Sequence, residues 1–542
     1  MNRRVVSRRV VSGESGVGSG AHRNRQSAWR LVGGGVVLAY SLLTTPDSLL
    51  SQDTEAGKVI YDQWCAGCHG ETGAGDGDAA AFMLPRPRDF RMAIYQIRTT
   101  ASGELPTDSD MRRVIDNGMP GTTMPGWGDK LSGGERDDVI AYLKTFSRFF
   151  DGASPQAIDI GREPRRPSDE DLAEARRLFA DELQCVRCHG NQGRGDGTSA
   201  PTLTDDAGFP VRAADLAENW NFNGGGTVAD IYMRMRTGLD GTPMPSNSDV
   251  IDAGIITDEQ LWRVAQYVRS LAPDDPPEPR DVVRAARFEG PLPSSPEDTL
   301  WENVEAYYIR MVGQVTIKPR WFAPTVDGLW VSAAHNDETL TVKLTWNDAS
   351  QSPDPEWDEF FQGVVQTMTD IDGPLPTQQG PDRIVVQFPV KAPEGTELPF
   401  FLGGDTRRPV YLWRWTSEPD RVEEGTATGL GTFLATGASE VTHTAVFSEG
   451  QWQLQFTRSL VPADSSIAAT FVPGERLPIA FYAADGTDAE DATRGAISAW
   501  YAIYLDVPTP PRVFVAPIVA ALFAAGLGLA IVWQAQRQQR KT

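Results

Sequence analysis

The hydrophobic residues of this chain of 542 residues follow three patterns along its length. Apolar residues recur at helical spacing in Val139–Leu143 and Leu261–Val268, each behind an acidic first turn. From Leu300 onward, apolar and polar residues alternate in short runs rich in Val, Trp, Tyr and Phe. The segments 31–43 and 513–533 are continuous uncharged runs. These patterns predict a multidomain chain with all-α domains first, then an antiparallel β-sandwich, then one C-terminal transmembrane helix.

The two uncharged runs indicate membrane-related segments. Residues 513–533 form a run of 21 residues, which is enough to cross about 30 Å of hydrocarbon. The run 31–43 has 13 residues behind an Arg-rich start, so residues 1–52 are predicted to be a signal peptide or an N-terminal anchor. Because basic residues follow the C-terminal run, we expect the C-terminus in the cytoplasm and the domains on the extracytoplasmic (periplasmic) side of the membrane.

An internal repeat covers the N-terminal half of the chain. The stretch CAGCHGETGAGDG at residues 65–77 recurs as CVRCHGNQGRGDG at residues 185–197, and GTTMP at 121–125 recurs as GTPMP at 241–245. Both matches have an offset of 120 residues, which drifts to 125 in the final helices through a short insertion after Met244. The repeat predicts two homologous domains.

The repeat and the change of pattern near Leu300 set the predicted boundaries. They give a signal peptide or anchor at 1–52, a first helical domain at 53–150, a linker at 151–167, a second helical domain at 168–273, a Pro-rich linker at 274–297, a β-sandwich at 298–507, a transmembrane helix at 513–533 and a basic tail at 534–542.

The repeated C-x-x-C-H motif is the attachment site of c-type haem. Two sulfurs bond to the porphyrin, and the adjacent histidine gives one axial nitrogen to iron, so the three groups must share one helical turn. Zinc would need two more ligands at each site, and a thioredoxin-like pair would not need a histidine in both copies. We therefore predict two covalently bound haem c groups. Their predicted thioether residues are Cys65, Cys68, Cys185 and Cys188, and their histidine ligands are His69 and His189.

Two methionines in the repeated loops are candidates for the second axial ligand. Met124 and Met244 each lie 55 residues after the histidine of their own motif and precede a proline. A thioether is a soft, neutral ligand that raises the reduction potential of haem. Met119 also precedes a proline, but its repeat partner is Leu239. We predict that Met124 and Met244 are the iron ligands; the alternative is two buried loop methionines beside haems that are five-coordinate or bound by another ligand.

The charge of the chain excludes one class of partner. The formal net charge is −23, although residues 1–30 are basic. A surface this acidic repels nucleic acid. The charge is explained either by solubility or by an acidic docking face for a basic redox partner. No phosphate loop, nucleophile elbow or Rossmann glycine pattern is present, so we predict no catalytic residues.

Residues 53–273 resemble tandem class I cytochrome c domains. The resemblance rests on CAGCHGETGAGDG and CVRCHGNQGRGDG, on the G-T-x-M-P loops and on the C-terminal helices. In that family the Gly-rich stretch after the haem motif wraps the haem edge. The resemblance therefore implies an electron-transfer function.

The β-rich region resembles the haem-binding γ-subunits of the dimethyl sulfoxide reductase family, such as those of ethylbenzene dehydrogenase and of nitrite oxidoreductases. The resemblance rests on LWVSAAHNDETLTVKLTWND, DRIVVQFP, LPFFLGGDTRRPVYLWRWT and TRGAISAWYAIYL. It implies a b haem held by methionine and lysine. This chain has Gly403 where the methionine is expected and Arg494 near the lysine position, so we expect the fold to be kept without haem b. The substitute ligands that remain open are His335, His443, Met311 and Met368.

Together these features predict a membrane-anchored dihaem electron-transfer protein. We expect a non-catalytic subunit or partner of a molybdenum oxidoreductase, linked to nitrite or nitrate, that contacts molybdenum and iron–sulfur subunits. The alternative is a dihaem cytochrome serving another oxidase or dehydrogenase, with the β-domain binding carbohydrate or protein. A dihaem peroxidase would need an open haem, which the paired methionine loops disfavour.

Overall fold

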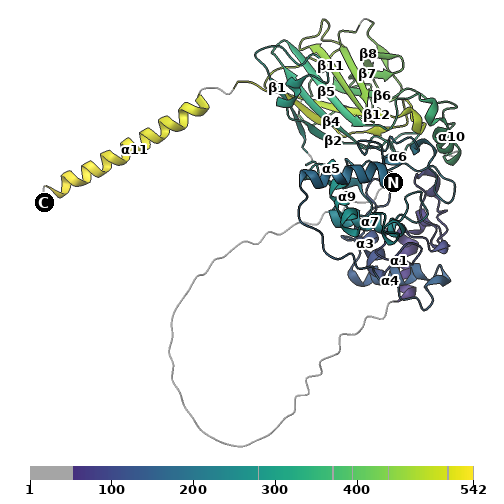
Figure 1. Cartoon of the computed structure of the whole chain (residues 1–542). Coiled ribbons are helices and arrows are strands. Elements are labelled where there is room, and N and C mark those ends of the chain that lie inside the picture. Colours follow the sequence, from purple (N-terminus) through teal and green to yellow (C-terminus); the bar gives the residue numbers. More distant parts are fainter. Residues whose placement is uncertain are drawn as a thin grey trace, which may run out of the picture. The chain divides into compact units, whose positions relative to one another are not determined.

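The computed structural model describes residues 53–278, 280–368, 372–393, 395–437, 439–508 and 512–540. The predicted signal peptide or anchor at 1–52 lies outside these residues. The described chain contains two helical regions, a large β-sheet domain and a long C-terminal helix (Figure 1). The fold class predicted from the hydrophobic pattern is confirmed.

Each helical region is built from short helices joined by glycine-rich loops. The first contains α1 (Thr54–Trp64), α2 (Ala66–His69), α3 (Asp108–Asn117) and α4 (Gly133–Lys144). The second contains α5 (Asp169–Arg177), α6 (Val186–His189), α7 (Val228–Thr237), α8 (Ser248–Asp252) and α9 (Asp258–Leu271). Helix α8 occupies the insertion that the repeat analysis placed after Met244.

The helix starts repeat as closely as the haem motifs do. A capping box, in which two residues satisfy each other's backbone N–H groups, starts five of these helices; the box at α5 stands alone, and the other four recur between the two regions. The pairs are Thr107 with Asp110 at α3, Thr227 with Asp230 at α7, Ser132 with Glu135 at α4, and Thr257 with Gln260 at α9. The first two pairs are 120 residues apart and the last two are 125 apart, as in the sequence repeat.

The C-terminal helix of each region packs across the helix that leads to the haem motif. In the first region α4 lies so close to α1 that a Cβ at Gly57 would stand 2.0 Å from the carbonyl oxygen of Asp138, so only glycine fits there. In the second region α9 packs against α5 and α7, where Tyr232 stacks on Trp262 at 3.9 Å between ring centroids. These contacts hold the helices that lead toward the haem motifs and the methionine loops.

Among its described residues, the β-domain contains fourteen strands in two packed layers and a short helix, α10 (Asp358–Thr367). The strands are β1 (Val282–Arg287), β2 (Tyr307–Arg310), β3 (Val312–Gly313), β4 (Gly328–His335), β5 (Thr339–Asn347), β6 (Arg383–Pro389), β7 (Val410–Ser417), β8 (Asp420–Ala427), β9 (Leu434–Ala435), β10 (Thr442–Ser448), β11 (Gln451–Ser459), β12 (Arg476–Ala484), β13 (Ala496–Ile497) and β14 (Tyr501–Leu505). The main strand order is β10-β11-β5-β4-β1-β14-β12-β6-β7-β8-β9.

Strand β12 belongs to both layers of the domain. Its first half pairs with β14 and its second half pairs with β6. Tryptophans fill the space between the layers: Trp346, Trp413, Trp415 and Trp452 are each at most 3% exposed. The indole rings of Trp415 and Trp452, from opposite layers, lie 4.9 Å apart. Alternation of apolar and polar residues therefore predicted the core of the β-domain.

Strand β1 corrects two details of the sequence prediction. It lies within 274–297, where the sequence predicts only a linker. The strand was not predicted because neighbouring prolines and acidic residues obscured its short alternating pattern. Val283 and Ala285 are fully buried in the core. The strand pairs in parallel with both β4 and β14, so the sheet is mixed rather than wholly antiparallel.

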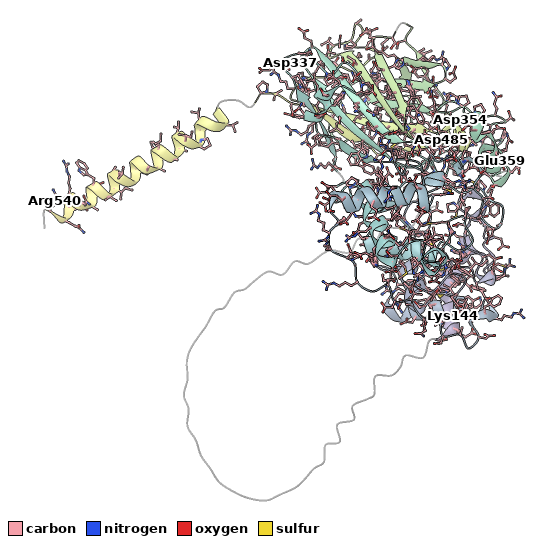
Figure 2. All side chains as sticks on the ribbon, in the orientation of Figure 1. Lys144, Asp337, Asp354, Glu359, Asp485 and Arg540 are labelled. Carbon is pink, nitrogen blue, oxygen red and sulfur yellow. The ribbon has the colours of Figure 1, made fainter. Side chains whose placement is uncertain are left out.

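Helix α11 (Arg512–Gln539) contains the predicted transmembrane segment. An 18-residue window within Val515–Gln539 has a mean hydropathy of 2.5, and no other helix in the described ranges is both as long and as apolar. Side chains along residues 515–540 are exposed, and Arg540 lies just beyond the end of the helix (Figure 2). The helix continues past 533 into the range predicted as a basic tail.

Candidate haem-binding sites

The first C-x-x-C-H motif forms a single helical turn at the end of α1. The backbone N–H groups of Cys68 and His69 both donate to the carbonyl of Cys65, at 3.1 and 2.9 Å. The carbonyl of Gly70, just after the motif, accepts a hydrogen bond of 2.6 Å from the buried hydroxyl of Tyr61. This turn places both cysteines and the histidine together, as attachment of haem c requires.

The second motif has the same backbone geometry. The N–H groups of Cys188 and His189 donate to the carbonyl of Cys185, at 3.2 and 2.9 Å. The cysteines of both motifs are partly buried free thiols. Burial raises the pKa of Cys65 and of Cys185 to about 12, so these thiols are protonated at neutral pH before any bond to a porphyrin forms.

The glycine-rich stretch after each motif folds back onto the motif. The N–H of Gly75 donates to the carbonyl of His69, and the N–H of Gly195 donates to that of His189, both at 2.9 Å. A Cβ at Gly77 would lie 2.4 Å from the carbonyl oxygen of Gly67. Glycine is therefore required where the loop crosses the motif.

Each candidate histidine ligand is oriented by a backbone carbonyl. Nδ1 of His69 lies 3.1 Å from the carbonyl oxygen of Arg88, and Nδ1 of His189 lies 2.9 Å from that of Ala214. Donation from Nδ1 leaves Nε2 free to bind a metal. Burial lowers the pKa of both histidines, which favours the neutral imidazole.

Sequence reasoning missed Arg88 and Ala214. They lie 19 and 25 residues after their histidines, so they do not match in the repeat, and a backbone carbonyl leaves no signal in residue type. In the first region Phe90 stacks on the ring of His69 at 4.5 Å, and this residue was also missed.

The two methionine loops have nearly identical backbone hydrogen bonds. In the first loop the N–H of Met119 donates to the carbonyl of Met124, and the N–H of Met124 reaches the hydroxyl of Thr122, at 3.1 and 3.2 Å. In the second loop the N–H of Leu239 donates to the carbonyl of Met244 at 3.1 Å. The residue at position 119 or 239 thus stabilises the loop through its backbone N–H group, and this bond does not depend on the side chain.

The two candidate methionines lie at equivalent places in their loops. Both side chains are partly buried, and Met244 packs against the same hydrophobic cluster as Cys185. The donor set in each region is two thiols, one histidine with a free Nε2 and one thioether. This set fits a covalently attached haem with histidine and methionine ligands.

The second methionine loop also contacts the first helical region. Asp240, in that loop, forms an ion pair of 2.7 Å with the fully buried Arg98 and accepts a hydrogen bond of 3.0 Å from Ser102. Arg98 also donates to the carbonyl of Thr237, at the end of α7. A Cβ at Gly241 would lie 3.5 Å from a guanidinium nitrogen of Arg88, whose carbonyl orients His69. The second methionine loop therefore contacts residues that lie around the first candidate haem site.

The two β-domain residues at the expected haem b ligand positions, Arg494 and Gly403, have other structural roles. Arg494 is 5% exposed and donates to Asp491 and to the carbonyl of Pro374, at 2.8 and 3.0 Å. Gly403 has a φ of +77°, a conformation that favours glycine over methionine.

The four substitute ligands for haem b are engaged elsewhere. His335 has both ring nitrogens in hydrogen bonds, with the carbonyl of Asp506 and the N–H of Asp337. His443 lies 2.8 Å from the carboxylate of Asp420. Met311 and Met368 are buried in two separate hydrophobic clusters.

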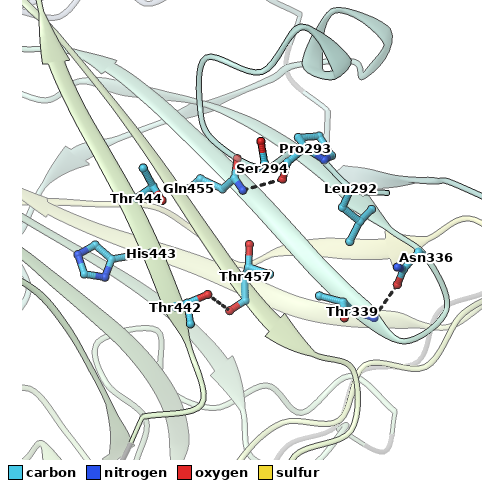
Figure 3. A pocket seen from close by; sticks show the side chains of 10 residues that line it. All are labelled: Leu292, Pro293, Ser294, Asn336, Thr339, Thr442, His443, Thr444, Gln455 and Thr457. Carbon is cyan, nitrogen blue, oxygen red and sulfur yellow. Dashed lines mark hydrogen bonds between the residues drawn. The ribbon is translucent and has the colours of Figure 1, made fainter. Parts of the chain in front are cut away.

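A polar hollow of about 350 Å³ lies on the β-domain beside β10 and β11 (Figure 3). The residues that line it include no Trp, Tyr or Phe: they are Leu292, Pro293, Ser294, Asn336, Thr339, Thr442, His443, Thr444, Gln455 and Thr457. Gln455 donates to the carbonyl of Pro293 at 2.9 Å. Without an aromatic face, the hollow lacks the usual platform for stacking a sugar ring.

Two family descriptions match the helical regions. Residues 52–143 match cytochrome c oxidase, cbb3-type, subunit III, and residues 172–272 match cytochrome c. The matched segments include both C-x-x-C-H motifs and both methionine loops. The two helical regions are cytochrome c domains.

Similar proteins extend the comparison beyond the helical regions. A protein of Haloferax mediterranei named as a respiratory nitrate reductase heme subunit is 26% identical over 247 residues, which cover 45% of this chain and 81% of that protein. Dimethylsulfide dehydrogenase subunit gamma of Rhodovulum sulfidophilum is 25% identical over 210 residues, 36% of this chain and 69% of that subunit. A chain of the reducing HAO-like protein complex of Kuenenia stuttgartiensis is 42% identical, covers 41% of this chain and is itself 97% covered, with a TM-score of 0.38.

Proposed function

We propose that this cytochrome c protein, a relative of the haem and γ subunits of oxidoreductases, is a membrane-anchored electron-transfer subunit of a molybdenum oxidoreductase. The relatives are subunits of multi-subunit oxidoreductase complexes. The observation that carries the proposal is the pair of equivalent sites, each with two thiols, an oriented histidine and a methionine loop. Bound haem would supply a one-electron iron couple at each site.

The axial ligands that we propose are His69 with Met124 in the first domain and His189 with Met244 in the second. The hydrogen bonds from Nδ1 to backbone carbonyls support the histidines, because they direct Nε2 away from the protein backbone. The equivalent loop geometry supports the methionines. Two protein ligands at each iron leave no open coordination position, which favours electron transfer over catalysis at haem.

We propose that the chain passes electrons between its two cytochrome domains. The ion pair between Arg98 and Asp240 holds the second methionine loop against the first domain. The segment containing Arg88 supports His69 through its carbonyl and approaches Gly241 with its side chain. These contacts bring the surroundings of the two sites together, which favours transfer within one chain.

The β-domain is proposed as the part that docks onto the molybdenum and iron–sulfur subunits, without a b haem of its own. The engagement of Arg494 with Asp491 supports the absence of a lysine-like ligand, since an arginine guanidinium stays protonated in proteins. A nitrate or nitrite substrate for the whole complex is the finer form of this proposal. It is motivated by the named activity of the Haloferax relative.

Helix α11 is proposed as the membrane anchor, with the C-terminus in the cytoplasm and the domains outside it. The 18-residue window of mean hydropathy 2.5 within Val515–Gln539 supports the anchor, and the basic residues after Trp533 support the orientation.

Purification of the full chain under mild detergent from its native membrane tests the proposal. We expect molybdenum and iron–sulfur subunits to co-purify with it. We also expect haem c of the chain to be reduced or oxidised when the substrate of the complex is added. Recovery of the chain with a terminal oxidase and without molybdenum would overturn the assignment of the partner.

A further inference from the structure

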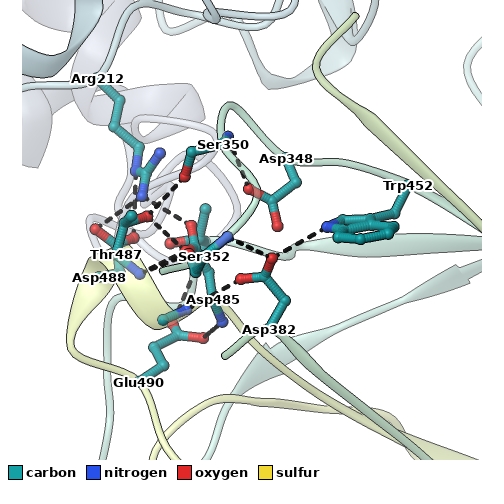
Figure 4. A network of polar contacts seen from close by, with 12 residues as sticks. Arg212, Asp348, Ser350, Ser352, Asp382, Trp452, Asp485, Thr487, Asp488 and Glu490 are labelled. Atoms are coloured by element: carbon teal, nitrogen blue, oxygen red, sulfur yellow. Dashed lines mark hydrogen bonds and ion pairs between the residues drawn. The ribbon is translucent and has the colours of Figure 1, made fainter. Parts of the chain in front are cut away.

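One end of the β-domain buries five carboxylates close together (Figure 4). Asp348 follows β5, Asp382 precedes β6, and Asp485 follows β12. Strands β6 and β12 are antiparallel with Arg383 opposite Ala484, so the aspartates that flank this pair meet at the same edge. Each of the five is at most 6% exposed: Asp348, Asp382, Asp485, Asp488 and Glu490.

The positive charge near this group is smaller than its negative charge. Among the described residues, Arg212 is the only cationic side chain that forms ion pairs with these carboxylates, and it contacts Asp485 and Asp488 at 2.9 Å. Glu490 is satisfied separately by the indole of Trp321 and by two backbone N–H groups. Asp348 and Asp382 therefore have no cationic partner among the described residues, and Asp485 shares its one arginine with Asp488. Buried charges of one sign need a counter-charge or protons.

Asp348 has an oxygen without any partner. Its Oδ1 accepts the N–H of Ser350 at 3.1 Å, but the buried Oδ2 has no hydrogen-bond partner. The side chain is 3% exposed, so bulk water does not satisfy this atom. Figure 4 shows the carboxylate of Asp348 turned toward that of Asp382. Asp382 accepts from the N–H groups of Ser352 and Gly486 and from the indole of Trp452, but none of these donors satisfies Oδ2 of Asp348. A buried carboxylate oxygen without a donor, turned toward a second carboxylate, indicates that a positive group belongs there.

The spacing of the three aspartates suits a calcium-sized ion. One carboxylate oxygen from each of Asp348, Asp382 and Asp485 lies within 4.8 Å of the others. Oxygens that bind one Ca²⁺ at about 2.3–2.6 Å can be no more than about 5.2 Å apart. We propose that Asp348, Asp382 and Asp485 bind a hard divalent cation of the calcium class. The donors are all oxygens, which excludes a soft-metal site.

Neighbouring hydroxyl groups can complete the coordination. The hydroxyls of Ser352 and Thr487 both contact Oδ1 of Asp485. Oδ1 of Asp382 accepts one hydrogen bond, of 3.2 Å, from the N–H of Gly486, so it has acceptor capacity left. Ca²⁺ takes about 6–8 oxygen ligands, and carboxylates and hydroxyls in this group provide a large part of that number.

The proposed cation also stabilises the contact between the second cytochrome domain and the β-domain. Arg212 belongs to the cytochrome domain, donates to Oδ2 of Asp485 at 2.9 Å and lies over the rings of Trp357 and Phe360. A cation on the triad would fix the carboxylate of Asp485 for this interaction. Loss of the cation is then expected to weaken the contact between domains as well as the β-domain.

The test is metal analysis of the purified full chain with its haem attached. The chain is treated with a chelator and then dialysed against Ca²⁺. Its calcium content is measured by elemental mass spectrometry, and the amount of haem iron gives the number of chains. We expect about one tightly held Ca²⁺ per chain and a melting temperature that rises when Ca²⁺ replaces the chelator. No bound divalent ion and an unchanged melting temperature would overturn the proposal in favour of shared protons.

A pair of variants separates loss of cation binding from a general loss of stability. Asp348→Asn changes the triad, and Asp358→Asn is its control. Asp348→Asn removes one charge from the triad, so it is expected to lose the Ca²⁺, to melt above the unsubstituted chain in chelator and to melt below it in Ca²⁺. Asp358 is exposed at the start of α10, and its variant should bind Ca²⁺ normally. If Asp348→Asn is the more stable form in both conditions, the triad holds no cation.

Discussion

Met119 and Met124 lie in one loop, yet the internal repeat keeps only the second of them as a methionine. The backbone of Met119 binds the carbonyl of Met124, and Leu239 does the same for Met244 in the second loop. A leucine at this position shows that the side chain is free to vary. The repeat keeps Met124 and Met244 as methionine, together with the glycine, threonine and proline of the G-T-x-M-P loop.

Met124→Ala is therefore expected to open the first haem and lower its reduction potential, because a thioether ligand stabilises ferrous iron. The spectrum should lose the sulfur-to-iron charge-transfer band of one haem and gain a high-spin signal. Met119→Leu is the matched control, because it installs the residue of the second loop and should change neither property. Similar changes in both variants would show that Met124 is not the ligand.

The hydroxyl of Tyr61 ties α1 to the carbonyl of Gly70 just after the first haem motif. Tyr61 is fully buried, so Tyr61→Phe leaves that carbonyl without its donor. We expect a loss of about 1–2 kcal/mol in the free energy of unfolding. Urea unfolding followed by circular dichroism measures it. Tyr142→Phe, at a partly buried ring in contact with Tyr61, is the control and should cost less.

At the level of elements, the sequence predicted helices and strands better than it predicted their partners. Capping boxes and C-x-x-C-H turns are local, so the residues that form them are adjacent in the chain. The carbonyls of Arg88 and Ala214 were missed because any residue has a carbonyl. Strand β1 was missed because its partners, β4 and β14, are far away in sequence and its own six residues are a weak signal.

A second acidic group, of which one member is buried and two are partly buried, lies between elements of the second cytochrome domain and the β-domain. Asp215 and Glu218 precede α7, and Asp327 precedes β4. Asn221 and Asn347 donate to these carboxylates, with Asn221 3.0 Å from Glu218. Burial raises the pKa of Asp215 to about 6 and raises that of Glu218 and of Asp327. Arg194 and Arg310 oppose these shifts in part.

These raised pKa values predict that stability falls as pH rises. Above about pH 4 the unfolded chain releases protons that the folded chain still holds, so the stabilisation is complete below that pH and is lost as pH rises through the folded pKa values. Glu218→Gln should flatten the decline between pH 5 and pH 8 by about 1 kcal/mol or more. Thermal unfolding across this range measures it. Glu170→Gln, at an exposed carboxylate on α5, should leave the decline unchanged.

At the scale of the whole molecule, the order of domains followed directly from the sequence. The repeat located both cytochrome domains, and the switch from helical to alternating periodicity located the β-domain. The contacts that join the domains, such as Arg98 with Asp240 and Arg212 with Asp485, could not be predicted. Single charged residues are common on surfaces, and only folding shows which of them face each other.

The proposed anchor predicts where a truncated chain is found. Removal of residues 509–542 deletes α11, and the protein should move from the membrane fraction to the soluble fraction with its haem spectrum unchanged. Ultracentrifugation of lysed cells with haem staining measures this. If the truncated chain stays in the membrane, then α11 is not the sole anchor, and the uncharged run at 31–43 is the next segment to remove.

The central claim is that the chain binds two c haems, each with histidine and methionine as iron ligands. A pyridine haemochrome spectrum with haem and protein quantification on the full chain tests it most directly, together with the ferric spectrum of the same sample. The account predicts two haem c and no haem b per chain, with both irons low-spin and unreactive toward carbon monoxide. Fewer than two haem c, an additional haem b or a high-spin haem that binds carbon monoxide would contradict it.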